Sequence, residues 1–399
     1  MQTRSQNWLR AVLIVEDWQN GGFGLYLHWP FCQAKCPYCD FNSHVSAHVD
    51  QTRWLTAFQS EIKRYGALTE GRVLNTVFFG GGTPSLMSPE TVNGILECAR
   101  ETWVWANDIE ISLEANPTSI EANKFIGFRD AGVNRVSMGM QALNDTDLKR
   151  LGRLHSVADG KRAFDIARST FDRVSFDLIY ARQDQTLKNW EAELTEALSM
   201  AIDHLSLYQL TIEAGTAFGD RYDRGSLRGL PDDDCSADMF ELTQSLCEDT
   251  GFSAYEVSNH AKNGAISKHN MIYWKYGDYI GIGPGAHGRV TVNGVKTATT
   301  TPLLPTDWLT QVETTGNGDL SVQTLPINDQ VIEMLMMGLR VTDGVERNRL
   351  GQLNQNSSFI NNIKGLQDNG FVETTDTHLT VTPTGRPILN AVLRELLVD

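Results

Sequence analysis

Six apolar, β-branched or aromatic stretches recur along the first half of the chain, and segments with helical periodicity separate them. The stretches cover residues 23–28, 73–79, 108–114, 135–138, 174–179 and 204–211. The helical segments cover residues 52–65, 89–102, 120–131, 158–170 and 187–201. Because strands that alternate with helices form parallel sheets with right-handed crossovers, this pattern predicts an α/β fold whose sheet curls into a partial barrel.

The 399 residues divide into four predicted parts. An N-terminal segment (1–21) precedes the partial barrel (22–215), and a mixed extension rich in acidic and glycine residues follows (216–325). In the last part (326–399), a helix at 334–339 and a second at 359–368 precede a turn and the alternating string HLTVT. This order predicts a small C-terminal domain of winged-helix type.

Charge and hydropathy limit the partners. With 34 basic and 49 acidic residues the net charge is −15, which disfavours nucleic acid and favours docking over DNA binding for the C-terminal domain. The longest early apolar run, residues 11–15, is far shorter than the ~20 residues that a membrane helix needs. We therefore expect neither a membrane span nor a targeting peptide.

Three of the six cysteines, Cys32, Cys36 and Cys39, form the pattern CxxxCxxC in CQAKCPYC. This spacing is not that of a disulfide framework and indicates a metal site in a reducing compartment. A structural zinc ion would need a fourth, remote ligand. A 4Fe-4S cluster held by three cysteines would leave one iron open to a small molecule. The cysteines by themselves leave both alternatives open.

Polar groups follow the next predicted strands. The string FFGGGTPS ends the second strand, and its glycines either form a tight turn or expose amides to a carboxylate or phosphate. Glu114, Gln141 and Asp177 lie at or near the ends of the following three strands, where each by itself could be a cap or turn residue. Because α/β folds bind ligands at the carboxyl ends of parallel strands, these groups together predict a polar small-molecule pocket beside the cysteines.

CxxxCxxC ahead of GGGTPS resembles the radical S-adenosylmethionine proteins. The strings SLEANP, GVNRVSMGMQ, LGRLH, DLIYA and LYQLTIEAGT resemble the oxygen-independent coproporphyrinogen oxidase family, over residues 22–390. The resemblance implies a 4Fe-4S cluster on the three cysteines, with S-adenosylmethionine chelating the open iron. An electron entering the cluster would cleave the sulfonium bond and yield a 5′-deoxyadenosyl radical. The implied contacts to S-adenosylmethionine come from Tyr26, Tyr38, Gly81, Gly82, Thr83, Glu114, Gln141, Arg153 and Asp177.

Two branches of this family differ after the motif. The oxidase carries a further cysteine where this chain has Phe41, and a longer N-terminal extension than the 25 residues before Tyr26. The string HNMIYW, which runs from His269 to Trp274, resembles the HNxxYW motif of HemW-type heme chaperones. The resemblance implies that His269 is an axial heme ligand beside a flat wall of Tyr273 and Trp274. The alternative is a hydrogen-bonded structural histidine with core aromatics. His260 and His287 are weaker candidates for the axial ligand.

We therefore expect a heme chaperone that carries a 4Fe-4S cluster and S-adenosylmethionine and passes heme to an acceptor protein. The alternative is oxygen-independent coproporphyrinogen III oxidase, which decarboxylates propionates oxidatively. The acidic charge disfavours a third hypothesis, a radical enzyme acting on RNA. Whether the protein is an enzyme is left open, and oxidase activity is not expected. We expect an electron donor as a partner and a cytoplasmic location, and we leave open a homodimer and a peripheral membrane contact.

Overall fold

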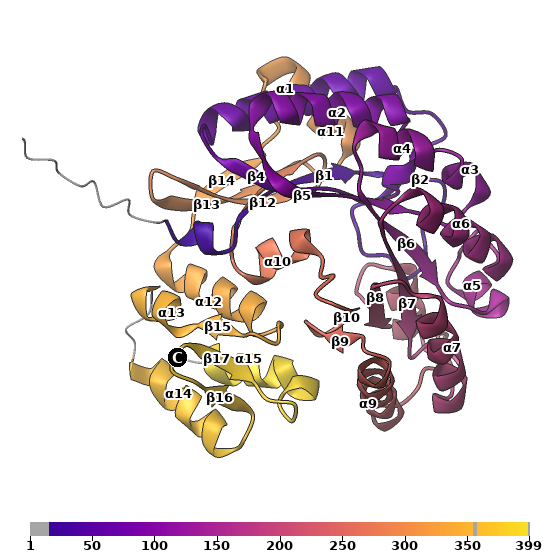
Figure 1. The fold of residues 1–399 in the computed structure, drawn as a ribbon, viewed down its shortest axis with the longest axis vertical. Coiled ribbons are helices and arrows are strands. Elements are labelled where there is room, and N and C mark those ends of the chain that lie inside the picture. The colour runs from indigo at the N-terminus through magenta and orange to yellow at the C-terminus, as the bar shows by residue number, and fades with distance from the viewer. Residues whose placement is uncertain (1–15, 354–356, 398–399) are drawn as a thin grey trace, which may run out of the picture.

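The computed structural model describes residues 16–353 and 357–397, so most of the expected N-terminal segment lies outside the described residues. Its largest sheet curls through the molecule in the order β14-β13-β12-β11-β1-β4-β5-β6-β7-β8-β10-β9 (Figure 1). The strands of this sheet are Phe23–Trp29 (β1), Val73–Gly81 (β4), Val104–Ala115 (β5), Arg135–Gln141 (β6), Arg173–Tyr180 (β7), His204–Gln209 (β8), Ser253–Ala254 (β9), Asn259–Ala261 (β10), Asp278–Ile282 (β11), His287–Val292 (β12), Val295–Thr300 (β13) and Ser321–Thr324 (β14).

The strands from β11 through β1 and β4 to β8 run parallel, and they include all six predicted strands. Helices cover the outer face of this curved sheet (Figure 1). They are Gln51–Leu68 (α1), Pro89–Thr102 (α2), Ser119–Ala122 (α3), Phe125–Ala131 (α4), Asp145–Arg150 (α5), Val157–Thr170 (α6) and Leu187–Met200 (α7). The main apolar core lies between the sheet and these helices. The predicted α/β partial barrel is confirmed, although the helix predicted at 120–131 is divided into α3 and α4.

The predicted mixed extension contributes strands to the same sheet. β11 pairs in parallel with β1, and β12 to β14 continue outward as antiparallel strands. The helices of this region are Ala217–Asp223 (α8), Asp233–Asp249 (α9), Lys268–Trp274 (α10) and Pro305–Thr315 (α11). Asp232 in the acidic string PDDD caps α9 by accepting from the Cys235 amide, and acidic groups at this end favour the helix.

A second apolar core lies in the C-terminal domain and contains Leu335, Leu379 and Val392. Its helices are Ile327–Gly338 (α12), Arg347–Leu353 (α13), Ser357–Asp368 (α14) and Leu389–Leu397 (α15). Its small sheet consists of Val345–Glu346 (β15), Val372–Thr374 (β16) and His378–Val381 (β17). The remaining short elements are Asp17–Asn20 (η1), Phe31–Cys32 (β2), His44–Val45 (β3), Pro84–Leu86 (η2) and Arg386–Ile388 (η3). Among the described residues, no helix combines the length and apolar character that a membrane crossing requires.

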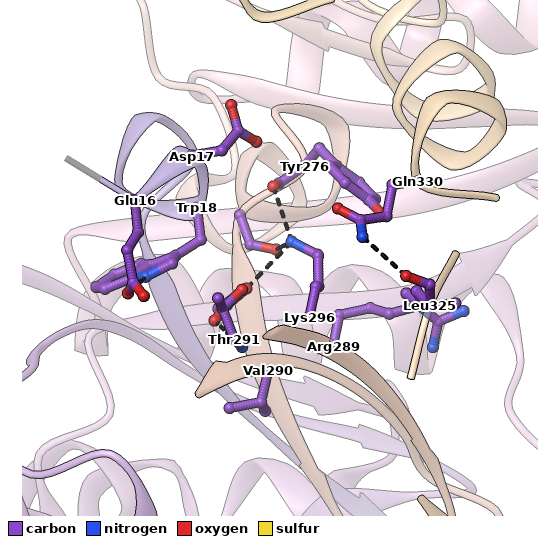
Figure 2. A network of polar contacts seen from close by, with 12 residues as sticks. Glu16, Asp17, Trp18, Tyr276, Arg289, Val290, Thr291, Lys296, Leu325 and Gln330 are labelled. Carbon is purple, nitrogen blue, oxygen red and sulfur yellow. Dashed lines mark hydrogen bonds and ion pairs between the residues drawn. The ribbon is translucent and has the colours of Figure 1, made fainter. Parts of the chain in front are cut away.

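A polar network joins the C-terminal domain to the sheet. Glu333 of α12 accepts from the Tyr276 hydroxyl at 3.0 Å and from Arg289 of β12 at 2.6 Å. Beside it the buried Lys296 donates to the Tyr276 carbonyl at 3.3 Å and to Asp278 at 3.1 Å. Figure 2 shows the Lys296 ammonium directed at Tyr276, with Arg289 on the neighbouring strand. Glu333 therefore joins the C-terminal domain to Tyr276 and β12, and Lys296 joins Tyr276 to Asp278 of β11.

Candidate functional site

The three cysteines lie on one loop after β1. β2 pairs with β3, which places Cys32 opposite Val45, and the Cys39 amide donates to the Cys36 carbonyl at 3.1 Å. All three are free thiols. Burial raises the pKa of Cys32 and of Cys39, so these thiols are protonated until a metal displaces the proton.

The glycine loop after β4 packs directly against Cys32. Thr83 donates from its amide to the Phe31 carbonyl at 2.9 Å and from its hydroxyl to the Cys32 Sγ at 3.4 Å. A Cβ on Gly82 would lie 3.0 Å from that sulfur, and Gly81 has a φ of 109°. Only glycine fits this approach and this backbone conformation, so the two predicted loops meet.

Arg153 joins the cysteine loop to two strand ends. Its guanidinium donates to the Cys36 Sγ at 3.4 Å, to the Asn116 Oδ1 at 2.6 Å and to the Gly139 carbonyl at 2.9 Å. Gln141 has a φ of 66° and folds its amide over Gly139, a backbone strain that is common at functional sites. The buried Nε of Arg153 has no partner among the described residues.

Asn116 and Glu121 belong to this arrangement, although we did not predict them. Asn116 donates to the Thr83 hydroxyl at 3.2 Å, and its backbone amide donates to Glu121 at 2.9 Å. The buried Glu121 also accepts from the Ser85 hydroxyl in the glycine loop. The sequence offered one sign of Asn116: it is a polar residue two positions after Glu114 in SLEANP, directly after the same predicted strand.

Glu114 and Asp177 carry raised pKa values on the inner side of the barrel. Burial and the charge of Asp177 raise the pKa of Glu114 to about 8, against a backbone hydrogen bond from Gly81. Burial raises the pKa of Asp177 to about 6, against hydrogen bonds from Ser206 and Ser137. Both residues are partly exposed, although protein surrounds their carboxyl groups.

Tyr26 and the HNMIYW segment meet inside the barrel. The Tyr26 hydroxyl shares a 3.0 Å hydrogen bond with the His28 Nδ1, and its ring stacks on His269 with 6.4 Å between centroids. His269, 1% exposed, shares Nδ1 with the Thr76 hydroxyl at 2.6 Å and Nε2 with the Tyr273 hydroxyl at 2.7 Å. Both ring nitrogens are therefore occupied, and heme ligation by His269 would require one of these bonds to break.

The remaining predicted aromatic residues lie in two different places. Trp274 follows Tyr273 in α10. The buried indole nitrogen of Trp274 has no partner among the described residues, and the Arg340 guanidinium lies 5.0 Å from the Trp274 ring centroid. Tyr38 lies in the cysteine loop, where its ring packs against Phe218 at 6.4 Å. The structure thus brings Tyr38 to the cysteines, and places Trp274 at the boundary with the C-terminal domain.

The cysteine loop supplies three thiols and a neighbouring hydroxyl. Within the described part of the chain, no three His, Cys, Asp or Glu side chains converge closely enough to hold one metal ion. A cubane cluster binds each thiolate to a different iron, so its cysteines stand apart. The buried Ser43 hydroxyl has no hydrogen-bond partner among the described residues, yet it lies close enough to lower the pKa of Cys32 and Cys39. Three cysteine thiols on one loop, beside a buried hydroxyl without a partner, can hold an iron–sulfur cluster that leaves one iron open.

Residues 26–196 match the Radical SAM superfamily, and residues 325–388 match the HemN C-terminal domain. The chain is 36% identical over 385 residues to the heme chaperone HemW of Haemophilus influenzae, with 94% of this chain and 98% of that protein covered. The chain belongs to the HemW family of radical S-adenosylmethionine proteins. A mouse relative, the mitochondrial radical S-adenosyl methionine domain-containing protein 1, is 41% identical over 80% of this chain and 74% of that protein.

A solved structure agrees with the HemW-family fold. Coproporphyrinogen III oxidase (HemN) from Escherichia coli superimposes with a TM-score of 0.79 over 94% of this chain and 90% of that chain. The sequence identity is 20%, so the likeness concerns the fold. Radical SAM proteins hold a 4Fe-4S cluster and bind S-adenosylmethionine, and these are the cofactors of this HemW-family chain. Every residue predicted to contact them, from Tyr26 to Asp177, falls within the matched range.

Proposed function

We propose that this protein is a heme chaperone, which binds heme and transfers it to an acceptor protein. One observation carries the proposal: the full-length similarity to a protein named heme chaperone HemW, which covers both the barrel and the C-terminal domain. The exposed Phe41, at the position where the related oxidase has a cysteine, agrees with this branch of the family.

We propose that Cys32, Cys36 and Cys39 hold the cluster, which together with S-adenosylmethionine supplies one-electron chemistry. The glycine loop lets a ligand approach the backbone closely, because Gly81 and Gly82 carry no side chain. Arg153 stands between Cys36 and the strand ends, where it orients an anionic group. Glu114 and Asp177, two partly exposed carboxyl groups inside the barrel, suit hydroxyl groups such as those of a ribose.

An electron donor has a suitable approach beside the cysteines. A cleft of about 620 Å³ is lined by Cys36 and Cys39 together with Lys35, Lys149 and Arg221. These side chains give the cleft a basic lining, although the chain as a whole has a net charge of −15. We propose that an acidic redox protein docks here, since complementary charge steers association.

The free state of all six cysteines supports a reducing compartment, which agrees with our expectation of the cytoplasm. The animal relative is named as mitochondrial, so we propose the reducing environment rather than one organelle.

Hemin titration of the anaerobically reconstituted protein tests the function. We expect a Soret band that saturates near one heme per chain and decays as the heme passes to an added heme-free b-type hemoprotein. Absence of saturable binding would contradict the proposal. Binding without release to any acceptor would reduce the function to heme storage.

A further inference from the structure

Two neighbouring barrel strands, β6 and β7, begin with the same three residues, RVS, and pair in register. Arg135 of β6 lies opposite Arg173 of β7, and Ser137 lies opposite Ser175. Because alternate residues of a strand point to the same face, Arg135 and Ser137 share one face of β6, and Ser175 and Asp177 share one face of β7. The register therefore brings an arginine, two serines and a carboxylate together on the two strands.

Hydrogen bonds join these four side chains in series. The Arg135 guanidinium donates to the Ser175 hydroxyl at 2.9 Å. The Ser175 hydroxyl donates to the Ser137 hydroxyl at 3.0 Å, and the Ser137 hydroxyl donates to the Asp177 Oδ1 at 3.3 Å. An arginine can only donate and an ionised carboxylate can only accept, so the two hydroxyl groups must both be oriented from Arg135 toward Asp177. We call this series of hydrogen bonds the serine relay.

Arg135 is a buried cation that lacks an ion pair. It is 3% exposed, and its other hydrogen bond goes to the Ser112 hydroxyl at 3.4 Å. No carboxylate of the described residues forms an ion pair with it, whereas Arg173 in the same register pairs with Glu110 at 2.9 Å. Hydrogen bonds in a chain polarise and strengthen one another in a protein interior. The relay therefore carries the influence of the Arg135 charge to Asp177.

Asp177 lies among other titratable and charged groups. Burial raises the pKa of Asp177 to about 6. The groups that oppose this rise, by hydrogen bonds or by charge, are Ser206, Arg135, Ser137 and Arg153. Burial and the charge of Asp177 raise the pKa of Glu114 to about 8, and they also raise the pKa of Tyr208 on β8. At pH 7 Asp177 is therefore ionised, while Glu114 keeps its proton.

We propose that Arg135, Ser175 and Ser137 are positioning residues, which hold Asp177 as an ionised acceptor for the ribose hydroxyl groups of S-adenosylmethionine. An ionised carboxylate accepts hydrogen bonds at both oxygens, whereas a protonated one uses an oxygen as a donor. The assignment rests on the proposed contact between Asp177 and the cofactor. It adds to that contact three residues that do not touch the ligand themselves.

Isothermal titration calorimetry with S-adenosylmethionine at pH 6.5 and 8.5 tests the relay in the reconstituted full-length protein. Loss of a hydrogen bond to a charged group moves a pKa by about one unit. Ser137→Ala and Ser175→Ala should therefore each raise the pKa of Asp177 and weaken binding about threefold at pH 6.5, with little loss at pH 8.5. Ser137→Thr, which keeps the hydroxyl, should restore the wild-type pH dependence. The amino group of the ligand titrates alike in every variant, so the differences between variants report the protein.

Two further variants separate the relay from packing. Ser112→Ala removes a buried serine that also accepts from Arg135 but does not lead to Asp177, and it should follow the wild type. The double variant Ser137→Ala/Ser175→Ala should lose no more affinity than Ser137→Ala alone, because one break interrupts the whole series.

Infrared spectroscopy of the cofactor-free protein supplies a readout that does not depend on ligand binding. Asp177→Asn identifies the carboxylic acid band of Asp177, because that band is missing from its spectrum. In the single serine variants Ser137→Ala and Ser175→Ala the band should appear at a higher pH than in the wild type. A merely structural role of the serines would leave this titration unchanged.

Three outcomes would overturn the inference. A wild-type pH dependence in both Ser137→Ala and Ser175→Ala would refute the relay, while the contact of Asp177 with the cofactor would stand. Unchanged affinity of Asp177→Asn at both pH values would remove that contact and the inference together. A loss in Ser112→Ala equal to that in Ser175→Ala would assign the effect to packing around Arg135. Circular dichroism checks the fold of each variant, which the removal of single oxygen atoms should preserve.

Discussion

Arg153 donates a hydrogen bond to the sulfur of Cys36 at 3.4 Å, across 117 residues of sequence. The same guanidinium bonds Asn116 and the Gly139 carbonyl, at the ends of β5 and β6. The cysteine loop is thus held by the sheet edge that we propose binds S-adenosylmethionine. Substitutions should therefore separate cluster ligation from S-adenosylmethionine binding, because Cys36 serves the first and Arg153 the second.

Cys36→Ala should remove the cluster. Anaerobically reconstituted wild-type protein should show the broad iron–sulfur absorption and bound iron, and the variant should lose both because one iron loses its thiolate. Cys98→Ala is the matched control, since Cys98 is buried in α2 and bonds the Gln59 carbonyl. Equal iron content in Cys36→Ala and wild type would refute the ligand assignment.

Arg153→Gln should weaken S-adenosylmethionine binding more than it reduces iron content. The substitution removes a charge-assisted donor near the proposed carboxylate, which costs about 1.5–3 kcal/mol, or roughly ten- to hundredfold in affinity. Isothermal titration calorimetry of the reconstituted protein measures the affinity for S-adenosylmethionine. Arg150→Gln is the control, because Arg150 is exposed and pairs with Asp184 at 2.9 Å. Equal affinities of the two variants would contradict the role of Arg153.

Glu114→Gln should change how stability depends on pH. The pKa of Glu114 is raised to about 8, so between about pH 5 and 8 the folded protein keeps a proton that the unfolded chain has lost, and stability falls as pH rises. The variant should show a smaller fall, because only the raised pKa of Asp177, about 6, still contributes. Its free energy of unfolding at pH 8.5 should exceed that of the wild type by about 1–3 kcal/mol. Urea unfolding of the cofactor-free protein at pH 5.5, 7 and 8.5 measures the difference. Exposed Glu97→Gln should leave the wild-type dependence intact, and a parallel decline in Glu114→Gln would contradict the prediction.

The sequence predicted the parts of the fold that local patterning encodes. Strand periodicity located all six barrel strands, and the rule that ligands bind at strand ends brought Glu114 and Asp177 to the same interior. The pairing of β11 with β1 could not be predicted from local sequence patterns, because it joins residues more than 250 positions apart, such as Phe23 and Asp278.

Within the site, the roles of some residues depend on contacts with distant parts of the chain, which sequence patterns do not predict. Asn116 was missed because its importance comes from Arg153, a partner in a distant loop. HNMIYW predicted a ligand at His269, but spacing carries no information on whether Thr76 and Tyr273 will occupy both ring nitrogens. The role of His269 therefore stays a prediction, which hemin titration of a His269→Ala variant tests.

The protein should not convert coproporphyrinogen III to protoporphyrinogen. The resemblance places the exposed Phe41 at the position where the related oxidase has a cysteine. This chain therefore has no thiol at that position. Incubation with coproporphyrinogen, reductant and S-adenosylmethionine, followed by chromatography of the oxidised porphyrins, measures conversion. The oxidase of Escherichia coli is the positive control. Conversion above the background without S-adenosylmethionine would return the protein to the oxidase branch.

Asp278→Asn should destabilise the network that joins the sheet to the C-terminal domain (Figure 2). The fully buried Asp278 pairs with Arg72 at 2.8 Å and with Lys296 at 3.1 Å, and its loss leaves two buried cations without a countercharge, at about 3–5 kcal/mol. Asp17→Asn removes a partly exposed pair with Arg349 and should cost at most about 1 kcal/mol.

Raising the pH should restore part of the stability of Asp278→Asn. Burial lowers the pKa of Lys296, and Asp278 opposes this effect, so in the variant the folded protein should release the Lys296 proton at a lower pH than the unfolded chain. Stability should then rise with pH toward about pH 10. Urea midpoints at pH 7 and 9.5 measure the gain. Equal losses in the Asp278 and Asp17 variants, or no recovery at pH 9.5, would show that the network is not electrostatically coupled.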